Sequence, residues 1–389
     1  MKTIPTSLYI HFPWCAKKCP YCDFNSYAAP KNFPEKEYIN ALIYDLQSDL
    51  NKFPAKELHS IFLGGGTPSL FSASAINKLL CEINKLINFM QDLEITMEIN
   101  PGTCDQQKLI DLRAAGINRL SIGVQSFAPD KLKILGRIHN KDDAINLINQ
   151  AHHAKFKNIN LDLIHGLPTQ TCQDVLDDLQ TALKLQPTHL SCYQLTIEKN
   201  TCFGRNPPVL PDEENILLMQ QQINEILANA GFNKYEISNY CRSDYECQHN
   251  LNYWQFGDYL AIGAGAHGKF TDGKNIIRYI KNLDPNDYMS SSRAEKPSSR
   301  GLTAGSSCRY HSERIEKSQL PLEFMLNALR LINGVPKELF TQRTGLKLET
   351  IQNQLNQAID QGFIEDNPQQ IKPTPRGLQF LNQCLEIFV

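Results

Sequence analysis

Three closely spaced cysteines are the residues of this chain best suited to metal chemistry. Cys15, Cys19 and Cys22 form a C-x3-C-x2-C pattern on a short predicted loop that follows the apolar run 7–12. Thiolates are soft ligands that favour iron–sulfur clusters or zinc. Closed sites of either kind normally take four protein ligands, and the next cysteine is Cys81. The pattern therefore favours a four-iron cluster with one iron left open. A zinc knuckle, a disulfide and three unrelated core cysteines are the alternatives.

The elements around this loop have the pattern of a parallel α/β protein. From residue 7 to about 200, short apolar runs alternate with segments of helical period, which is typical of βα units around a parallel sheet. The predicted strands are 7–12, 60–63, 93–100, 119–127, 158–164 and 189–196, and the predicted helices begin near 35, 72, 105, 129, 141 and 171. Six units are too few for a closed eight-stranded barrel.

Polar residues recur where the predicted strands end. Besides the cysteine loop, these are the glycine-rich segment 64–67, Glu98, Gln125 and Asp162. In βα barrels the functional groups gather at the C-terminal ends of the strands. Each residue alone would more often be a loop or capping residue, but five consecutive strand ends predict one shared site.

The chain divides by composition into four parts. We expect a core at 1–235, a post-barrel segment at 236–285, a linker or insertion rich in Ser, Arg, Lys and Pro at 286–319, and a helical module at 320–389 with a small β-wing. The order of elements in this last module is like that of a winged helix, an α+β fold. Its third predicted helix, about 349–361, has no Lys or Arg, which argues against DNA binding.

Charge and hydropathy exclude several other classes. Lys and Arg number 39 against 41 Asp and Glu, a formal net charge of −2, so nothing points to nucleic acid or an anionic membrane. We expect no signal peptide and no membrane-spanning stretch. Twelve cysteines are scattered along the chain, which predicts reduced thiols in a cytoplasmic protein rather than a disulfide framework.

Four segments together carry a resemblance to a known family. Residues 9–15, 19–26, 64–68 and 162–168 resemble the radical S-adenosylmethionine (SAM) superfamily, in its branch of proteins like coproporphyrinogen oxidase. The resemblance implies an open six-unit (β/α)6 partial barrel, a [4Fe–4S] cluster on the three cysteines, and SAM bound at the open iron.

Two groups of this branch differ at positions that can be read here. The oxygen-independent coproporphyrinogen III oxidases have a further cysteine two positions after the third, where this chain has Phe24. They also have an N-terminal extension ahead of the barrel, whereas the first predicted strand of this sequence begins at about residue 7. The haem chaperones have a His-Asn-x-x-Tyr-Trp signature, which His249–Trp254 matches. The expected function is therefore a haem chaperone that binds haem and a SAM-liganded cluster and transfers haem to an acceptor protein, such as a respiratory one. The alternative is the oxidase, which converts two propionates to vinyls.

The resemblance also implies roles for single residues. The implied SAM contacts are Tyr9, Tyr21, Gly65, Gly66, Thr67, Glu98, Gln125, Arg137, Asp162 and Thr196. Glycine lets a ligand approach the backbone closely, the fork of Arg137 suits a carboxylate, and Glu98 or Asp162 suits ribose hydroxyls or an ammonium. In the oxidases several of these groups serve a second SAM, so the number of SAM molecules stays open. No catalytic residue is assigned.

His249 is the residue that the resemblance offers for haem. A neutral imidazole is a common axial ligand, and Tyr253 and Trp254 would wall in a flat macrocycle. A satisfied core histidine is the alternative, as is a zinc set with Cys241 and Cys247. The implied partners are haem, an acceptor protein and an electron donor, without nucleic acid; a homodimer is left open.

Overall fold

The structure is a computed structural model that describes residues 4–273, 275–293 and 310–389. Six parallel strands succeed one another in chain order and pair with their neighbours. They are β1 (Thr6–Phe12), β4 (Glu57–Gly65), β5 (Asn88–Ile99), β6 (Arg119–Gln125), β7 (Asn158–His165) and β8 (His189–Gln194). Each prediction of a strand from an apolar run is confirmed, and the sheet does not close on itself within the described residues. The fold is the open partial barrel that the sequence predicted.

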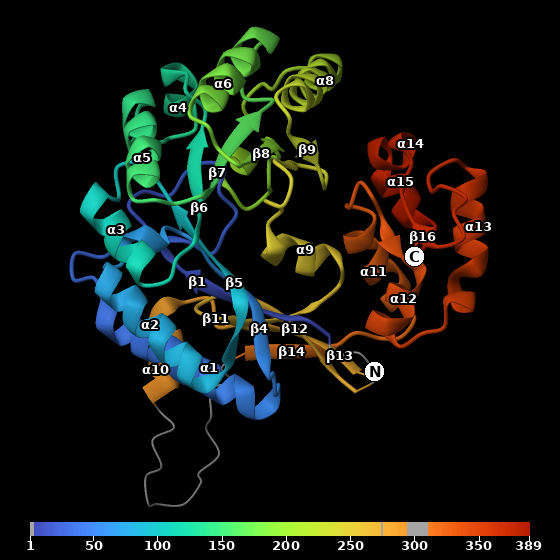
Figure 1. Ribbon diagram of the computed structural model, residues 1–389, viewed down its shortest axis with the longest axis horizontal. Coiled ribbons are helices and arrows are strands. Elements are labelled where there is room, and N and C mark those ends of the chain that lie inside the picture. The colour runs from blue at the N-terminus through green and yellow to red at the C-terminus, as the bar shows by residue number, and fades with distance from the viewer. Residues whose placement is uncertain (1–3, 274, 294–309) are drawn as a thin grey trace, which may run out of the picture.

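Helices follow the strands and cover the outer face of the curved sheet (Figure 1). They are α1 (Glu35–Lys52), α2 (Ala73–Leu86), α3 (Gln106–Ala114), α4 (Pro129–Ile134), α5 (Lys141–His153), α6 (Cys172–Lys184), α7 (Cys202–Arg205) and α8 (Glu213–Asn229), with a 3-10 turn η1 (Pro68–Leu70). The predicted caps Ser72, Asp105 and Thr171 each accept a hydrogen bond from a backbone N–H of the first turn. Such caps satisfy donors that the helix itself leaves free.

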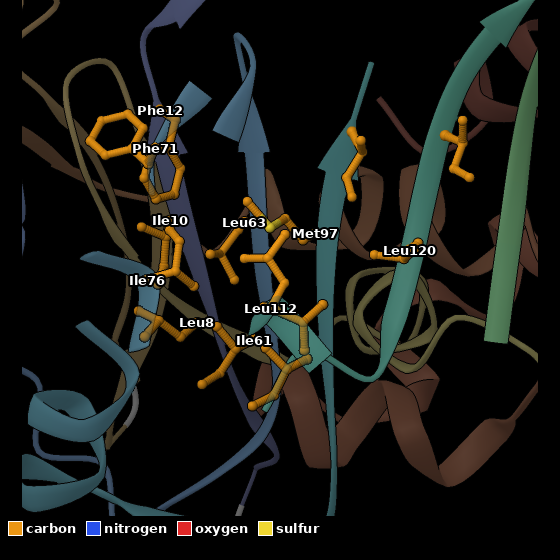
Figure 2. Packing of buried hydrophobic residues seen from close by; sticks show 14 of the residues in the cluster. Leu8, Ile10, Phe12, Ile61, Leu63, Phe71, Ile76, Met97, Leu112 and Leu120 are labelled. Carbon is orange, nitrogen blue, oxygen red and sulfur yellow. The ribbon is translucent and has the colours of Figure 1, made fainter. Parts of the chain in front are cut away.

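Side chains along each strand alternate between the apolar core beneath the helices and the concave inner face of the barrel. Leu8, Ile10 and Phe12 of β1 point toward the helices and are fully buried. Figure 2 shows them with Ile61 and Leu63 of β4 in one continuous apolar layer. Because successive side chains of a strand point to opposite faces, Ser7, Tyr9 and His11 lie on the concave inner face. The barrel interior is thus free to hold polar residues.

The segment after the barrel extends the same sheet on both sides. On the β1 side lie β11 (Asp258–Ile262), β12 (His267–Asp272), β13 (Asn275–Lys281) and β14 (Tyr310–Arg314); on the β8 side lie β10 (Asn239–Cys241) and β9 (Asn233–Lys234). β11 is parallel to β1, and β12 to β14 are antiparallel. From the sequence, residues 236–285 were predicted only as a post-barrel segment. In the structure, strands of this segment belong to a sheet of 12 strands within the described residues.

A buried ion cluster fixes this extension to the barrel. The Lys281 amino group of β13 lies 2.7 Å from a carboxylate oxygen of Asp45 and 2.8 Å from one of Asp49, both on α1. Tyr288, on α10 (Pro285–Arg293), donates to Asp45 at 2.6 Å. Removing one partner of a buried ion pair strands the other charge, so loss of any one member of the cluster would destabilise this docking. Of the expected linker 286–319, residues 294–309 lie outside the described residues.

The C-terminal module has its own apolar core and lies beside α9 (Gln248–Trp254) (Figure 1). Its elements are α11 (Leu320–Ala328), β15 (Val335–Pro336), α12 (Lys337–Thr344), η2 (Leu348–Ile351), α13 (Gln352–Asp360), β16 (Gln370–Ile371), α14 (Pro375–Gln379) and α15 (Leu381–Glu386). The third helix, expected as one unit, is divided into η2 and α13. The wing is reduced to the β15–β16 pair and one bridge between Ile364 and Pro373.

No helix of the described ranges combines the length and the apolar composition needed to cross a membrane.

Candidate functional site

A cleft of about 380 Å³ opens at the carboxyl ends of the barrel strands. All but one of the residues predicted for cluster and SAM binding line it. They are Cys15, Cys19, Tyr21, Cys22, Gly65, Gly66, Thr67, Glu98, Gln125, Arg137, Asp162 and Thr196. The barrel therefore brings together residues that are up to 181 positions apart in the chain, from 15 to 196. The exception is Tyr9, and His249, predicted for haem, does not line the cleft either.

The cysteine loop is closed by a short parallel pair, β2 (Trp14–Cys15) and β3 (Tyr27–Ala28). Within it, the Cys22 amide donates to the Cys19 carbonyl at 3.2 Å. The Lys18 amino group donates to the carbonyls of Phe24 and Ser26, each at 3.1 Å. These bonds hold a compact loop whose three thiols all border the cleft.

The three thiols are soft ligands of the kind an iron–sulfur cluster takes, and a cubane spreads its thiolates over several irons. Within the described residues, no group of three His, Cys, Asp or Glu side chains is arranged to hold one metal ion; this includes the three cysteines and the set Cys241, Cys247 and His249. Burial raises the pKa of the Cys15 and Cys22 thiols, so loading with metal would release protons.

The glycines after β4 are required by close packing. Gly65 has φ +109°, in the left-handed region, and a Cβ there would lie 2.4 Å from the His11 ring. A Cβ on Gly66 would lie 2.5 Å from the Trp14 carbonyl oxygen. Only glycine fits both positions, and the backbone beside the cysteine loop stays open to a ligand.

Arg137 joins the cysteine loop to strand ends β5 and β6. Its Nη2 donates to the Gly123 carbonyl at 2.8 Å and to the side-chain oxygen of Asn100, while Nη1 lies 3.8 Å from the Cys19 sulfur. Asn100 in turn donates to Thr67 at 2.9 Å. The guanidinium is thus held in place beside the three thiols.

Two carboxyl groups lie at the base of the cleft. Glu98 accepts a hydrogen bond from the Gly65 amide at 3.0 Å. Burial, followed by the nearby Asp162, raises the pKa of Glu98 to about 8, although the Gly65 hydrogen bond opposes the shift. Burial also raises the pKa of Asp162, against hydrogen bonds from Asn160 at 2.8 Å and Ser121 at 3.0 Å. Near neutral pH Glu98 is largely protonated and can donate as well as accept.

The sequence analysis missed several polar residues of this cleft. Asn100, Ser121, Asn160, Ser191 and Tyr193 also line it. Two of them lie two positions from a predicted site residue: Asn100 follows Glu98, and Asn160 precedes Asp162. Because a strand repeats its face every second residue, extending each strand-end residue by two would have found these two but not Ser121, Ser191 or Tyr193.

A second hollow of about 670 Å³, here called the outer cavity, lies on the other side of the cysteine loop. It is formed by Tyr9 of β1, Tyr253 of α9, Tyr259 of β11, His267 of β12 and loop residues 22–27. Cys22, Asp23 and Phe24 border both spaces. Tyr9, a predicted SAM contact, thus lies on the outer cavity, where its hydroxyl donates to His11 at 3.0 Å.

His249 lies between the two spaces and borders neither. Its Nδ1 is hydrogen-bonded to the Ser60 hydroxyl at 2.9 Å, and its ring centroid lies 4.9 Å from that of Tyr253 and 5.1 Å from that of Phe62. Nε2 is buried without a hydrogen-bond partner in the described structure. Burial lowers the pKa of His249 to about 3, so the imidazole is neutral.

The Trp254 side chain borders neither the cleft nor the outer cavity. The Arg330 guanidinium stacks over its ring at 4.3 Å, and the ring packs on the core of the C-terminal module. Of the two aromatic residues predicted to wall in a macrocycle, only Tyr253 borders a cavity.

Two family models match parts of this chain, and several known proteins are similar to it over its whole length. The family model described as Radical SAM superfamily matches residues 9–182, and that of the HemN C-terminal domain matches 315–380. The "Heme chaperone HemW" of Haemophilus influenzae is 47% identical over 393 residues, covering 100% of this chain and 99% of that protein. The proteins of the same name from Escherichia coli and Bacillus subtilis are 44% and 34% identical, over 100% and 98% of this chain and 99% of each relative.

Among solved structures, coproporphyrinogen III oxidase (HemN) from Escherichia coli, titled a radical SAM enzyme, superposes with a TM-score of 0.81. The match covers 99% of this chain and 90% of the oxidase at 21% identity. At that identity the likeness concerns the fold.

Proposed function

The chain belongs to the HemW family of the radical SAM superfamily, and on that premise we propose that it is a haem chaperone, which binds haem and transfers it to an acceptor protein. The observation that carries this proposal is the likeness over the whole chain to relatives named heme chaperone. The oxidase is similar only in fold. Haem is therefore the cargo of the protein and not its resident cofactor.

The cleft supplies the residues for a cluster and for SAM. Cys15, Cys19 and Cys22 would hold a [4Fe–4S] cluster, which supplies single electrons and an open iron when it is bound. The fixed guanidinium of Arg137 suits a carboxylate group. Glu98 and Asp162 suit hydroxyls or an ammonium, and the Gly65–Gly66 backbone allows close approach. Tyr21, Thr67, Gln125 and Thr196 complete the polar lining.

Haem ligation by His249 does not fit the described conformation. An axial ligand must present a ring nitrogen to the iron, but the His249 ring is only 2% exposed and lies behind Tyr9 and Tyr253. Its bond to Ser60 and its low pKa fit a core histidine, but its Nε2 has no hydrogen-bond partner within the described residues, so the ring is not the satisfied histidine of that alternative. Haem ligation by His249 would require a conformation that uncovers Nε2.

The proposed function also requires partner proteins and a reducing compartment. Transfer requires an acceptor protein, and reduction of a cluster requires an electron donor. The cysteines within the described residues are free thiols, as a reducing cytoplasm would keep them.

Two measurements on one sample test the proposed function. The chain is reconstituted anaerobically with iron and sulfide, titrated with haem, and then mixed with an apo-globin as a model acceptor. We expect a saturable Soret band that moves to the globin on mixing. A parallel incubation with coproporphyrinogen III, SAM and reductant should give no vinyl product. Haem uptake no greater than that of an unrelated protein of similar size, or vinyl formation at catalytic rates, would contradict the proposal.

A further inference from the structure

Three aromatic rings cover His249, and Phe62 is the one on the side of the cleft. The centroid of the His249 ring lies 5.1 Å from that of Phe62. The ring centroids of Tyr253 and Tyr9 lie 4.9 Å and 6.4 Å from it. Phe62 borders the cleft, whereas Tyr9 and Tyr253 border the outer cavity. Each ring therefore separates the histidine from one of the two spaces.

The hydrogen bonds of His249 leave its Nε2 in the form that binds iron. The Ser60 hydroxyl donates to Ser7 at 2.8 Å, so its oxygen accepts from the Nδ1–H of His249 at 2.9 Å. The neutral ring then carries its free lone pair on Nε2, which has no hydrogen-bond partner within the described residues. A neutral imidazole nitrogen whose partner nitrogen is held by a hydrogen bond is the usual histidine ligand of a metal.

Phe62 is the least restrained of the three rings. The Tyr9 hydroxyl donates to His11 at 3.0 Å, and the Tyr253 ring packs against that of Tyr259 at 4.3 Å. Phe62 has no polar atom through which a hydrogen bond could hold it, and it borders a cleft of about 380 Å³. A turn of this ring toward the cleft is therefore the smallest movement that uncovers the histidine.

The same ring packs beside a residue predicted to contact SAM. Gly64 lies between Phe62 and Glu98, because a Cβ at Gly64 would be 2.9 Å from the Phe62 ring and 3.1 Å from the Glu98 carboxyl carbon. Asn250, the neighbour of His249 on α9, also borders the cleft. A ligand that fills the cleft therefore lies against the ring that covers His249 and against the helix that carries it.

We propose that Phe62 is a gate between the two ligands of the protein: its ring turns into the cleft to uncover His249 for haem, and a ligand in the cleft holds it closed. The inference rests on the proposed function, with His249 as the haem ligand that the family resemblance implies. SAM should then weaken haem binding, and haem should weaken SAM binding by the same factor. Occupation of the cleft by SAM would favour release of haem to the acceptor.

The test measures both affinities on the full-length chain, reconstituted with its cluster under anaerobic conditions and kept without reductant. Ferric haem is titrated by its Soret band at rising SAM concentrations, and SAM affinity is measured by equilibrium dialysis with and without haem. In wild type we expect SAM to weaken haem binding by about 5-fold or more, reaching a limit at saturating SAM. The dialysis should give the same factor.

Phe62→Ala removes the gate and should uncouple the two ligands. We expect tighter haem binding than in wild type, because no ring has to move first, and an effect of SAM below about 2-fold. Phe62→Leu, which keeps a smaller apolar side chain, guards against a folding defect and should fall between. His249→Ala should bind haem weakly with or without SAM. The control Phe380→Ala, in the C-terminal module and bordering neither space, should match wild type.

The results distinguish failure of the gate from failure of the proposed function. The gate is overturned, while the function stands, if wild type binds both ligands without mutual effect or if Phe62→Ala keeps the full effect of SAM. Haem affinity that falls without limit as SAM rises indicates direct competition for the cleft and overturns it as well. Haem binding by His249→Ala equal to wild type removes His249 as the ligand, and the gate with it. Wild type that binds no haem contradicts the proposed function itself.

Discussion

The Nη1 of Arg137 donates to the sulfur of Cys19 across 3.8 Å. The same guanidinium donates to the Gly123 carbonyl and to Asn100, so one side chain connects the cysteine loop with two strand ends. A lysine has a single nitrogen and cannot reach these partners together.

Arg137→Lys should therefore weaken SAM binding more than cluster binding. We expect about 10-fold weaker SAM affinity, since one charge-assisted bidentate contact is lost, with iron content near wild type. Equilibrium dialysis with SAM and iron analysis of the same reconstituted samples measure both. The matched control is Arg113→Lys on the exposed side of α3. Unchanged SAM affinity would contradict the assignment of Arg137 to the ligand.

Cys19→Ser tests whether the cluster and the haem have separate binding sites. Cys19 borders the cleft and His249 does not, so we expect loss of the cluster and of SAM binding while most haem binding remains. Electron paramagnetic resonance of the reduced sample, SAM dialysis and haem titration follow the three properties. Cys81→Ser, at an exposed position of α2, should retain all of them. Equal loss of cluster and haem would argue against separate sites.

Because the pKa of Glu98 differs between the folded and the unfolded chain, the free energy of unfolding depends on pH between these two values. Burial and Asp162 raise its pKa to about 8, whereas in the unfolded chain it is about 4.3. Between these values the folded state holds a proton that the unfolded state has lost, so stability falls as the pH rises through the window. The loss of stability from ionising the buried Glu98 is absent below pH ~4 and complete above pH ~8.

Glu98→Gln removes this group and should flatten the profile. We expect the variant to be more stable than wild type by roughly 2–4 kcal/mol at pH 9, with little difference at pH 4.5. Urea unfolding of the metal-free chain across this range measures the difference. Glu57→Gln, an exposed residue at the start of β4, should follow wild type. A constant difference between Glu98→Gln and wild type over all pH values would show that Glu98 does not titrate in this window.

Lys281→Met tests the attachment of the sheet extension to the barrel. It leaves Asp45 and Asp49 buried without their cation, so we expect a loss of about 3–5 kcal/mol in urea unfolding. Lys36→Met, at an exposed position of α1, should change stability by less than about 0.5 kcal/mol. If Lys281→Met were as stable as the control, the cluster would contribute nothing to docking.

Local patterns predicted the barrel and most of its cleft. Strands such as β1 and β7 could be read from apolar runs between turn signals, and caps such as Thr171 from residue type. One rule, that strand ends of parallel βα units meet at one edge, placed the cysteine loop, the segment 64–67, Glu98, Gln125 and Asp162 together without knowledge of distant contacts. Tyr21, Arg137 and Thr196 came only from the family resemblance.

The outer cavity could not be predicted in this way. It exists because β11 pairs with β1 in the register Ser7 to Tyr259 and Tyr9 to Ala261, a contact between segments some 250 residues apart. No periodicity specifies which edge strand a late segment will choose. His249 is likewise buried by residues distant in sequence, against Ser60 and Phe62 of β4 and Tyr9 of β1, which the signature alone does not reveal.

The side chain of Asn25 has a consequence for the order of events during synthesis. Its amide donates to the carbonyls of Ala264 at 2.9 Å and Leu283 at 2.8 Å, although Asn25 follows Cys22 by only three residues. The thiols emerge early from the ribosome, but the loop that carries them lacks these two anchors until more than two-thirds of the polypeptide has been made. The fully anchored cysteine loop therefore forms only after the chain as far as Leu283 has been made.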